Sequence, residues 1–470
     1  MKRTFLYPVV LAVAASMALP FAQISSAAAG ETNVRHTIIA ATGGAAPGGG
    51  NYLSLRNATV NAQHQVAFDA VVNGPTSGSG VFVGDGNTTS SVMLGSATRP
   101  FITPNGEVVF TVNDIDSFSS DGKTIVPVVR DGDPVPGGGT LTPLARDVND
   151  HRVLAYGAFI SGSTATQGIF RNDGTQTVTI ARDDIAPPTG GTFTLLGDPV
   201  VNDRGQVAFF FGTEGGSSDF GILRGEGAEL TPVFVTNQIA PGGATFSDFS
   251  DPIINSHGQV AAVGVLTNST SHSGIFVGDG TNTVAIAIEG QTAPKGGIYA
   301  DPLHRGAFGA PVRLNDRGEV AFNAILTGGG TSSSGLFRGD GEHTTTIALA
   351  GTVAPGTTGT FNSFGDIKLL NDGRVAFIAS LTPGVGGVNT TNNLGIWIGT
   401  SDDDLQLVAR TGDVIGGKVL TRLPQFDFFF GGAHSFDINE NGVLWVGTFG
   451  AAKAVVFSRI LGDDGSSDVE

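Results

Sequence analysis

The segment Asn202-Asp-Arg-Gly-Gln-Val-Ala-Phe209 decides the fold of this chain, because copies of it recur along almost the whole sequence. Two close copies end at Ala262 and Phe322. Five weaker copies run from Asn61 to Phe68, Thr103 to Phe110, Asn149 to Tyr156, Leu370 to Phe377 and Asn439 to Val446. The eight copies, called box one here, are spaced by 54 residues on average. The chain is therefore one structural unit repeated about eight times.

Two further boxes complete the unit. Box two is exemplified by Gly274-Ile-Phe-Val-Gly-Asp-Gly280 and box three by Ile239-Ala-Pro-Gly-Gly243. Short runs that alternate or are rich in β-branched and aromatic residues lie between the boxes, as in 206–211 and 231–235. Glycine in box one and Asp-Gly in box two are typical of tight turns between strands, and the Pro-Gly pair of box three disfavours helix. The unit is predicted to contain four strands.

We therefore predict an all-β chain folded as a β-propeller of four-stranded antiparallel blades. A β-helix is the main rival, but its coils are much shorter than this unit. Eight blades are expected, and seven is the alternative because the second unit, about residues 91–139, lacks box two. Residues 36–60 contain a box three and residues 443–460 contain the first strands of a unit. We expect these two segments to pair and close the ring, so that deletion of 31–60 would unfold the protein cooperatively.

The first residues have the features of a secretion signal. Lys2 and Arg3 precede an apolar run to about Phe21, and small residues follow at 25–30. The expected organisation is a signal peptide at 1–29, a single propeller domain at 30–460 and an acidic disordered tail at 461–470. The apolar run contains two prolines and is too short to favour a membrane anchor. We expect no membrane span after cleavage and a location outside the cytoplasm, either secreted or in the cell envelope, extracellular or periplasmic.

Composition narrows the function. The 470 residues include 25 Lys+Arg, 42 Asp+Glu and no Cys, giving a formal net charge of −17. Disulfides, zinc knuckles and thiol nucleophiles are excluded. Nucleic-acid binding is not expected, because it requires a basic surface. We expect a monomer.

The boxes resemble those of a known group of proteins. Asn-x-x-Gly-x-Val-Ala-Phe and Gly-Ile-Phe-x-Gly-Asp-Gly are similar to the repeats of secreted bacterial proteins described as tandem-repeat NxxGxVAF-containing, a domain group of unknown function. The resemblance covers about 36–460 and implies export and a repeat fold, with no known catalytic residues. More remotely, Asn105-Gly-Glu-Val-Val-Phe110 is similar to the turn and strand of TolB-type propeller repeats.

Several short motifs are better explained by the repeat. Arg338-Gly-Asp340 matches an adhesion tripeptide but is also the local copy of box two. The segment 412–418 has the length of a phosphate loop, yet Val419 replaces the Ser or Thr that would bind magnesium. His64, His151 and His257 occupy turn positions of box one, where an exposed turn residue is the ordinary interpretation.

Acidic residues just before box three form the only chemical pattern. They are Asp131, Asp133, Asp183, Asp184, Glu289 and Asp413. Equivalent positions in a ring share one rim, so these acids could converge on a cation or a sugar, and paired carboxylates can hydrolyse glycosides. Solvated acidic loops that keep the protein soluble are the simpler interpretation. Calcium is a possible ligand, and 113–116 and 402–404 resemble calcium loops in composition without the spacing of an EF-hand.

The sequence predicts a non-catalytic exported protein that binds an extracellular glycan or protein partner, with no cofactor. The alternative is a carbohydrate-active hydrolase or lyase that uses Asp183, Asp184, Glu289 or Asp413. A third possibility is an envelope or matrix component without a soluble ligand.

Overall fold

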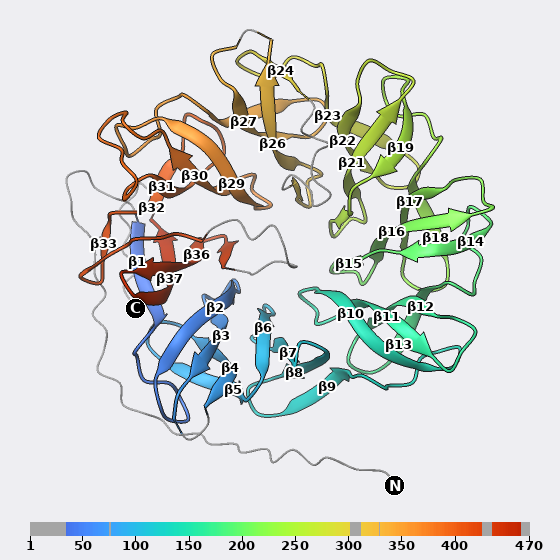
Figure 1. Ribbon diagram of the computed structural model, residues 1–470, viewed down its shortest axis with the longest axis horizontal. Helices are drawn as coiled ribbons and strands as arrows, with labels where there is room; N and C mark the ends of the chain where they lie inside the picture. The colour runs from blue at the N-terminus through green and yellow to red at the C-terminus, as the bar shows by residue number, and fades with distance from the viewer. Residues whose placement is uncertain (1–33, 75–76, 301–311, 329, 425–434, 462–470) are drawn as a thin grey trace.

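The computed structural model describes residues 34–74, 77–300, 312–328, 330–424 and 435–461. The predicted signal peptide and all of the predicted tail except Leu461 lie outside this range. Within it the chain forms eight blades of four antiparallel strands arranged in a ring, an eight-bladed β-propeller (Figure 1). The prediction of fold class and blade number is confirmed.

The first four blades follow one another along the chain. Blade 1 contains β2 (Tyr52–Val60), β3 (Val66–Val72), β4 (Gly78–Gly84) and β5 (Thr89–Leu94). Blade 2 contains β6 (Ala97–Ile102), β7 (Val108–Val112), β8 (Asp116–Ser120) and β9 (Ile125–Val129). Blade 3 contains β10 (Thr140–Val148), β11 (Leu154–Ser161), β12 (Gln167–Asn172) and β13 (Thr177–Arg182). Blade 4 contains β14 (Thr192–Leu196), β15 (Val200–Val201), β16 (Val207–Glu214), β17 (Phe220–Gly225) and β18 (Leu230–Val235). Blade 2 keeps four strands although it lacks box two.

The next blades repeat this order. In each of blades 4 to 6 the first strand is split into two short segments. Blade 5 contains β19 (Thr245–Phe249), β20 (Ile253–Ile254), β21 (Val260–Thr267), β22 (Ser273–Gly278) and β23 (Thr283–Ile288). Blade 6 contains β24 (Ile298–Tyr299), β25 (Val312–Leu314), β26 (Val320–Thr327), β27 (Ser334–Gly339) and β28 (Thr344–Leu349). Blade 7 contains β29 (Phe361–Leu369), β30 (Val375–Leu381), β31 (Leu394–Gly399) and β32 (Gln406–Arg410). A small hairpin of β33 (Val414–Ile415) and β34 (Lys418–Val419) leads to blade 8.

Blade 8 closes the ring with both ends of the chain. Its sheet has the order β1 (Val34–Ala41), β37 (Ala452–Ile460), β36 (Gly442–Phe449), β35 (Phe436–Asn439). The antiparallel register pairs Val34 with Ile460 and Thr37 with Phe457. The predicted closure is confirmed, but the N-terminal strand that pairs is Val34–Ala41 and not the whole of 36–60. Residues 52–60 form the first strand of blade 1, because the turn at box three after Ala41 carries the chain into the next blade.

The core lies between the blades, and box one builds it from both faces of each blade. Val260 packs in a cluster with Phe234 of blade 4, whereas the next residue, Ala261, packs with Phe322 of blade 6. Successive residues of a strand point to opposite faces, so each β-strand of this type is buried on both sides. This explains why Val-Ala-Phe is a continuous apolar run.

The asparagine of box one joins neighbouring blades. In blade 4, Asn202 Oδ1 accepts hydrogen bonds from the backbone N–H groups of Arg204 and Gln206 in its own turn, at 3.1 and 2.9 Å. Its Nδ2 donates to the backbone oxygen of Asn255 in blade 5, at 2.8 Å. The same bond to the next blade is made by Asn61, Asn149, Asn255, Asn315 and Asn439. We call this set of bonds the asparagine belt.

Two blades have no asparagine at this position, and arginines bridge their interfaces. Box one begins with Thr103 in blade 2 and Leu370 in blade 7. Arg152 of blade 3 contacts Glu107 of blade 2 at 3.3 Å, and Arg374 of blade 7 donates to the backbone oxygen of Glu440 in blade 8 at 2.7 Å. Every blade interface in the ring is thus crossed by a polar contact beside its apolar core.

The eighth copy of box one is one residue shorter than the others. Asn439 pairs with Gly442 in a tight turn, and Val443 and Trp445 pack toward blade 7 while Leu444 packs toward blade 1. Trp445 therefore takes the place of the phenylalanine, which the sequence pattern assigns to Val446. In the described part of the chain, no helix has the length and apolar character needed to cross a membrane.

Candidate functional site

The predicted acids lie after the outermost strands of different blades. Asp183 and Asp184 follow β13 of blade 3, Glu289 follows β23 of blade 5 and Asp413 follows β32 of blade 7. These blades alternate around the ring (Figure 1). Of these four acids, only the sequence neighbours Asp183 and Asp184 lie on the same blade.

Asp183 and Asp184 bind groups of their own blade. Asp183 accepts hydrogen bonds from the backbone N–H of Thr166, at 2.9 Å, and from its hydroxyl. Asp184 accepts from the hydroxyl of Thr164 at 2.6 Å and pairs with Arg182 at 3.0 Å. The hydrogen bond from Arg182, with that from Thr164, holds the pKa of Asp184 below its usual value. These carboxylates stabilise the end of blade 3.

The other acids before box three also cap local turns. The backbone N–H groups of Arg130 and Arg410 donate to Asp133 and Asp413, each three residues later, at 2.9 and 2.6 Å. Burial raises the pKa of Asp413. Glu289 lies 3.2 Å from the ring Nδ1 of His272. Each position therefore has a structural contact, and its catalytic role remains a prediction.

The motifs that the repeat explains are turns in the structure. Asp340 of the Arg-Gly-Asp triplet accepts from the backbone N–H groups of Glu342 and His343, at 2.8 and 2.7 Å. Residues 414–419 form the β33–β34 hairpin. Asp404 accepts from the backbone N–H groups of Thr400 and Ser401, at 2.8 and 2.7 Å. Among the described residues, no group of three or more His, Asp or Glu side chains could hold a metal ion, so calcium remains a prediction.

The turns nearest the axis carry a second set of acids, which the sequence analysis did not single out. They are Asp150, Asp203 and Asp316, each the second residue of box one; the same position is the polar Ser256 in blade 5 and Asn371 in blade 7. Asp203 accepts from the backbone N–H of Asp150 at 3.1 Å and from the hydroxyl of Ser256 at 3.2 Å. Burial and the charge of Asp203 raise the pKa of Asp150 to about 6. These acids belong to the blade interfaces.

The box-three loops present one exposed side chain each. Five of them are closed by an isolated bridge, such as Ile239 with Thr245 and Val353 with Thr360. The second residue is buried in most of these loops, as at Ala240, whereas the first points to solvent. Four first positions carry a large aliphatic side chain that is more than half exposed: Ile185, Ile239, Val353 and Val414. The fold does not bury these residues.

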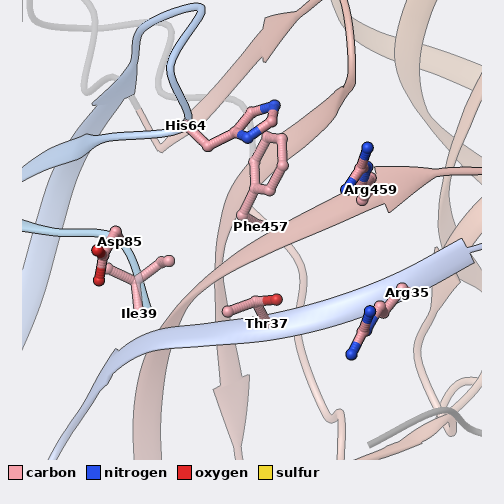
Figure 2. Close-up of a pocket in the computed structure, with 7 residues that line it drawn as sticks. All are labelled: Arg35, Thr37, Ile39, His64, Asp85, Phe457 and Arg459. Atoms are coloured by element: carbon pink, nitrogen blue, oxygen red, sulfur yellow. The ribbon is translucent and has the colours of Figure 1, made fainter. Parts of the chain in front are cut away.

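A pocket lies where blade 8 meets blade 1, and no local sequence signal marks it. It has a volume of about 120 Å³ and is lined by Arg35, Thr37, Ile39, His64, Asp85, Phe457 and Arg459 (Figure 2). We call it the seam pocket. A second cavity of about 210 Å³ shares Thr37 and Asp85 with it and is also lined by Lys418 and Lys453. The lining residues come from both ends of the chain, so sequence proximity could not reveal them.

The chain is similar to several solved structures, at low sequence identity and with low TM-scores. The β-propeller domain of the trilobed protease from Pyrococcus furiosus is 13% identical over 76% of this chain and 98% of that domain, with a TM-score of 0.40. A puromycin-hydrolysing peptidase from Mycobacterium tuberculosis is 13% identical over 84% of this chain and 57% of its own, with a TM-score of 0.40. An α-L-arabinanase from Penicillium chrysogenum is 13% identical over 66% of this chain and 98% of its own, with a TM-score of 0.29.

No curated protein matches the sequence. A family of unknown function does match, and the match covers residues 106–452, from the box-one turn of blade 2 to the first residue of β37. This range includes most of the repeats on which the fold and the candidate sites depend. The chain therefore belongs to the family of unknown function DUF7453.

Proposed function

We propose that this protein is an exported, non-catalytic binding protein whose box-three loops contact an extracellular protein partner. The observation that carries the proposal is the exposure of Ile185, Ile239, Val353 and Val414 at the same place of four loops. Ile239 and Val353 are 73% and 64% exposed. Loops on a rigid scaffold commonly carry binding residues, and exposed apolar groups at such positions favour contact with another protein.

A protein suits this arrangement better than a small ligand. Ile185 and Ile239 lie on consecutive loops, and so do Val353 and Val414. A partner that covers two loops must span neighbouring blades. Aliphatic side chains also lack the flat ring on which sugars stack, so a glycan is the second choice of partner.

We expect no catalysis because the predicted acids already accept hydrogen bonds that stabilise the fold. Asp183, Asp184 and Asp413 each accept hydrogen bonds from groups of their own blade. A hydrolase or lyase would need such carboxylates to be placed on either side of a substrate bond. Assay of new reducing ends on a polysaccharide panel tests this directly. Activity that disappears in Asp183→Asn or Glu289→Gln would establish the alternative.

Paired variants test the binding proposal. Ile185→Ser/Ile239→Ser and Val353→Ser/Val414→Ser should melt like the wild type, because these side chains are exposed. Each mature protein is then immobilised and exposed to envelope proteins of the producing cells. A protein retained by the wild type and by a Thr292→Ser control, lost with a paired variant and bound again after purification, would support the proposal.

Two results would contradict the proposal. One is equal retention of every protein by the wild type and both paired variants. The other is a glycan that raises the melting temperature of the wild type and of both paired variants by the same amount. Melting in EDTA and in calcium, run in parallel, tests the predicted calcium dependence.

A further inference from the structure

The seam pocket gathers positive charge in a strongly acidic protein. Arg35 of β1 and Arg459 of β37 are direct partners in the antiparallel register. Their side chains therefore lie on the same face of the sheet, the face that carries Thr37 and Phe457 (Figure 2). Like charges at directly opposite positions destabilise a pair of strands. Two positive side chains on one face of the sheet, both lining the pocket, make the pair a candidate for contact with an anion.

The position of the pair is specific to the closing blade. In blade 5, Val260 pairs with Gly278 and the next residue is Asp279, which caps the hairpin of box two. In blade 8 the equivalent Val443 pairs with Ser458, so Arg459 stands where five other blades have an aspartate, blade 4 has Glu226 and blade 7 has Thr400. The strands β1 and β37 come from opposite ends of the chain and form no hairpin here. The sign of the charge at this position is thus reversed at the seam.

His64 adds a nitrogen that has no partner. Its ring lies against Phe457, with 5.4 Å between ring centroids, and the backbone at His64 has a φ of 61°. Its Nε2 is enclosed and makes no hydrogen bond to any part of the chain that the structure describes. Burial and the charge of Arg459 lower the pKa of His64. The lowered pKa favours the neutral ring, which can donate or accept one hydrogen bond at Nε2.

We propose that the seam pocket binds an oxyanion, a carboxylate or sulfate group. The two guanidinium groups would donate charge-assisted hydrogen bonds, with His64 and the hydroxyl of Thr37 beside them. Asp85 lies on the opposite side of the pocket and caps its own hairpin, with Oδ1 accepting from the backbone N–H groups of Asn87 and Thr88 at 2.8 and 2.7 Å. A saccharide that carries the anion could also offer a hydroxyl group to this carboxylate. The ligand is then an acidic sugar, or a free inorganic anion.

Calorimetric titration of the mature protein tests the proposal. Sodium sulfate, sodium glucuronate and glucose are added at constant ionic strength in chloride buffer. We expect one site for sulfate and for glucuronate and none for glucose. Arg35→Gln and Arg459→Gln should each weaken binding at least about tenfold, because each removes charged donors. Arg130→Gln, which removes an exposed arginine of blade 2, should leave binding unchanged.

The comparison of ligands identifies the source of the anion. Tighter binding of glucuronate than of acetate would assign an acidic saccharide, and equal binding would assign the oxyanion alone. Either result supports an oxyanion site. No binding of any anion, or equal weakening by Arg35→Gln and Arg130→Gln, would overturn the proposal.

A second readout does not depend on the arginine variants. The NMR resonances of His64, assigned with a His64→Gln variant, are followed with pH in chloride and in sulfate. A bound anion offsets the charge of Arg459, so sulfate should raise the pKa of His64 in the wild type. An unchanged pKa at a sulfate concentration that saturates the calorimetric site would show that the anion binds elsewhere.

Discussion

The side-chain Nδ2 of Asn439 donates a hydrogen bond of 2.8 Å to the backbone oxygen of Asn61, 378 residues earlier in the chain. This bond carries the asparagine belt across the seam between blade 8 and blade 1. The asparagine of box one therefore has the same function at the closure as between consecutive blades. Its oxygen fixes its own turn, and its nitrogen binds the next blade.

Replacement of Asn439 by Asp should weaken the seam. The carboxylate can still accept from the backbone N–H groups of Asn441 and Gly442, but it cannot donate to Asn61. The Asn61 carbonyl keeps the hydrogen bond from the backbone N–H of His64, so the expected cost is that of one lost hydrogen bond, about 0.5–1.5 kcal/mol. Urea unfolding of Asn439→Asp should show this loss in the free energy of unfolding. Asn202→Asp should lose a similar amount, whereas Asn362→Ala, at an exposed site, should stay within about 0.5 kcal/mol of the wild type. Equal stability of all three variants would contradict a structural role of the belt.

Acid should loosen the closing strand through His36. Its Nδ1 lies 2.8 Å from the Ser458 hydroxyl, and that hydroxyl also accepts from the indole N–H of Trp445. Burial lowers the pKa of His36 to about 4, from an ordinary value of 6.5. The unfolded state therefore binds more protons between pH 6.5 and 4, and stability falls as the pH falls through this range. The contribution is about 3 kcal/mol at 1.36 kcal/mol per pKa unit.

His36→Asn should remove this dependence, since asparagine keeps a polar group near Ser458 but does not titrate. Urea unfolding at pH 7, 5.5 and 4.5 measures the difference between variant and wild type. His257→Asn, at an exposed turn, serves as the control and should parallel the wild type. If the His36→Asn profile also parallels the wild type, burial of His36 does not govern the acid response.

Asp147 should have the opposite dependence on pH. Burial raises its pKa to about 6, and its Oδ2 accepts from the backbone N–H of Val201 in blade 4 at 2.8 Å. The folded state therefore holds the proton more strongly between pH 4 and 6, so stability falls as the pH rises through this range. Asp147→Asn keeps an acceptor for Val201 and should be more stable at pH 7, by about 1–2 kcal/mol after allowance for partial exposure.

The matched control for Asp147 is Asp173→Asn. The hydroxyl and backbone N–H of Thr175 donate to Asp173 and lower its pKa, so its replacement should not stabilise the protein at pH 7. Unfolding at pH 5 and 7 separates the two variants. A less stable Asp147→Asn protein at pH 7 would show that the hydrogen bond needs the charge.

Arg35→Glu should stabilise the protein in the absence of an anion. The change converts the Arg35 and Arg459 pair from like to opposite charge across β1 and β37. Cross-strand pairs of this kind differ by about 0.2–1 kcal/mol, and the gain should shrink as salt screens the charges. Unfolding in 20 mM and 500 mM sodium chloride, between which the Debye length falls about fivefold, measures the effect. A destabilised Arg35→Glu protein at both concentrations would mean that Arg35 supports the fold by contacts other than charge.

Much of the architecture was predictable because each unit repeats the same local signals. Glycine with positive φ, as at Gly205 with φ 77°, and the Asp-Gly hairpin specify where strands end. The count of boxes then gave the number of blades. The bounds of the closing strand were not predictable, since 36–60 contain two strands of different blades that the same box separates.

The candidate sites were predictable only in part. The spacing from Arg130 to Asp133 and from Arg410 to Asp413 is that of a local turn, so a capping role could have been recognised in the sequence. The seam pocket could not, because Arg35, His64 and Arg459 meet only after the ring has closed. Their chemistry depends on a register between the two ends of the chain.

The pairing of Val34 with Ile460 has a consequence for how the chain can be rewired. A short linker between these residues, with new termini opened between Gly95 and Ser96, would give a circular permutant in which every blade is made from one continuous segment. In the natural chain the ring is closed by a blade whose strands come from both ends of the chain. In the permutant it would be closed by packing between blades 1 and 2 and by hydrogen bonds such as those from Asn61 to Thr103 and from Ile102 to Thr59. The difference in unfolding rate between the two chains would then measure how much the blade shared by both ends slows unfolding.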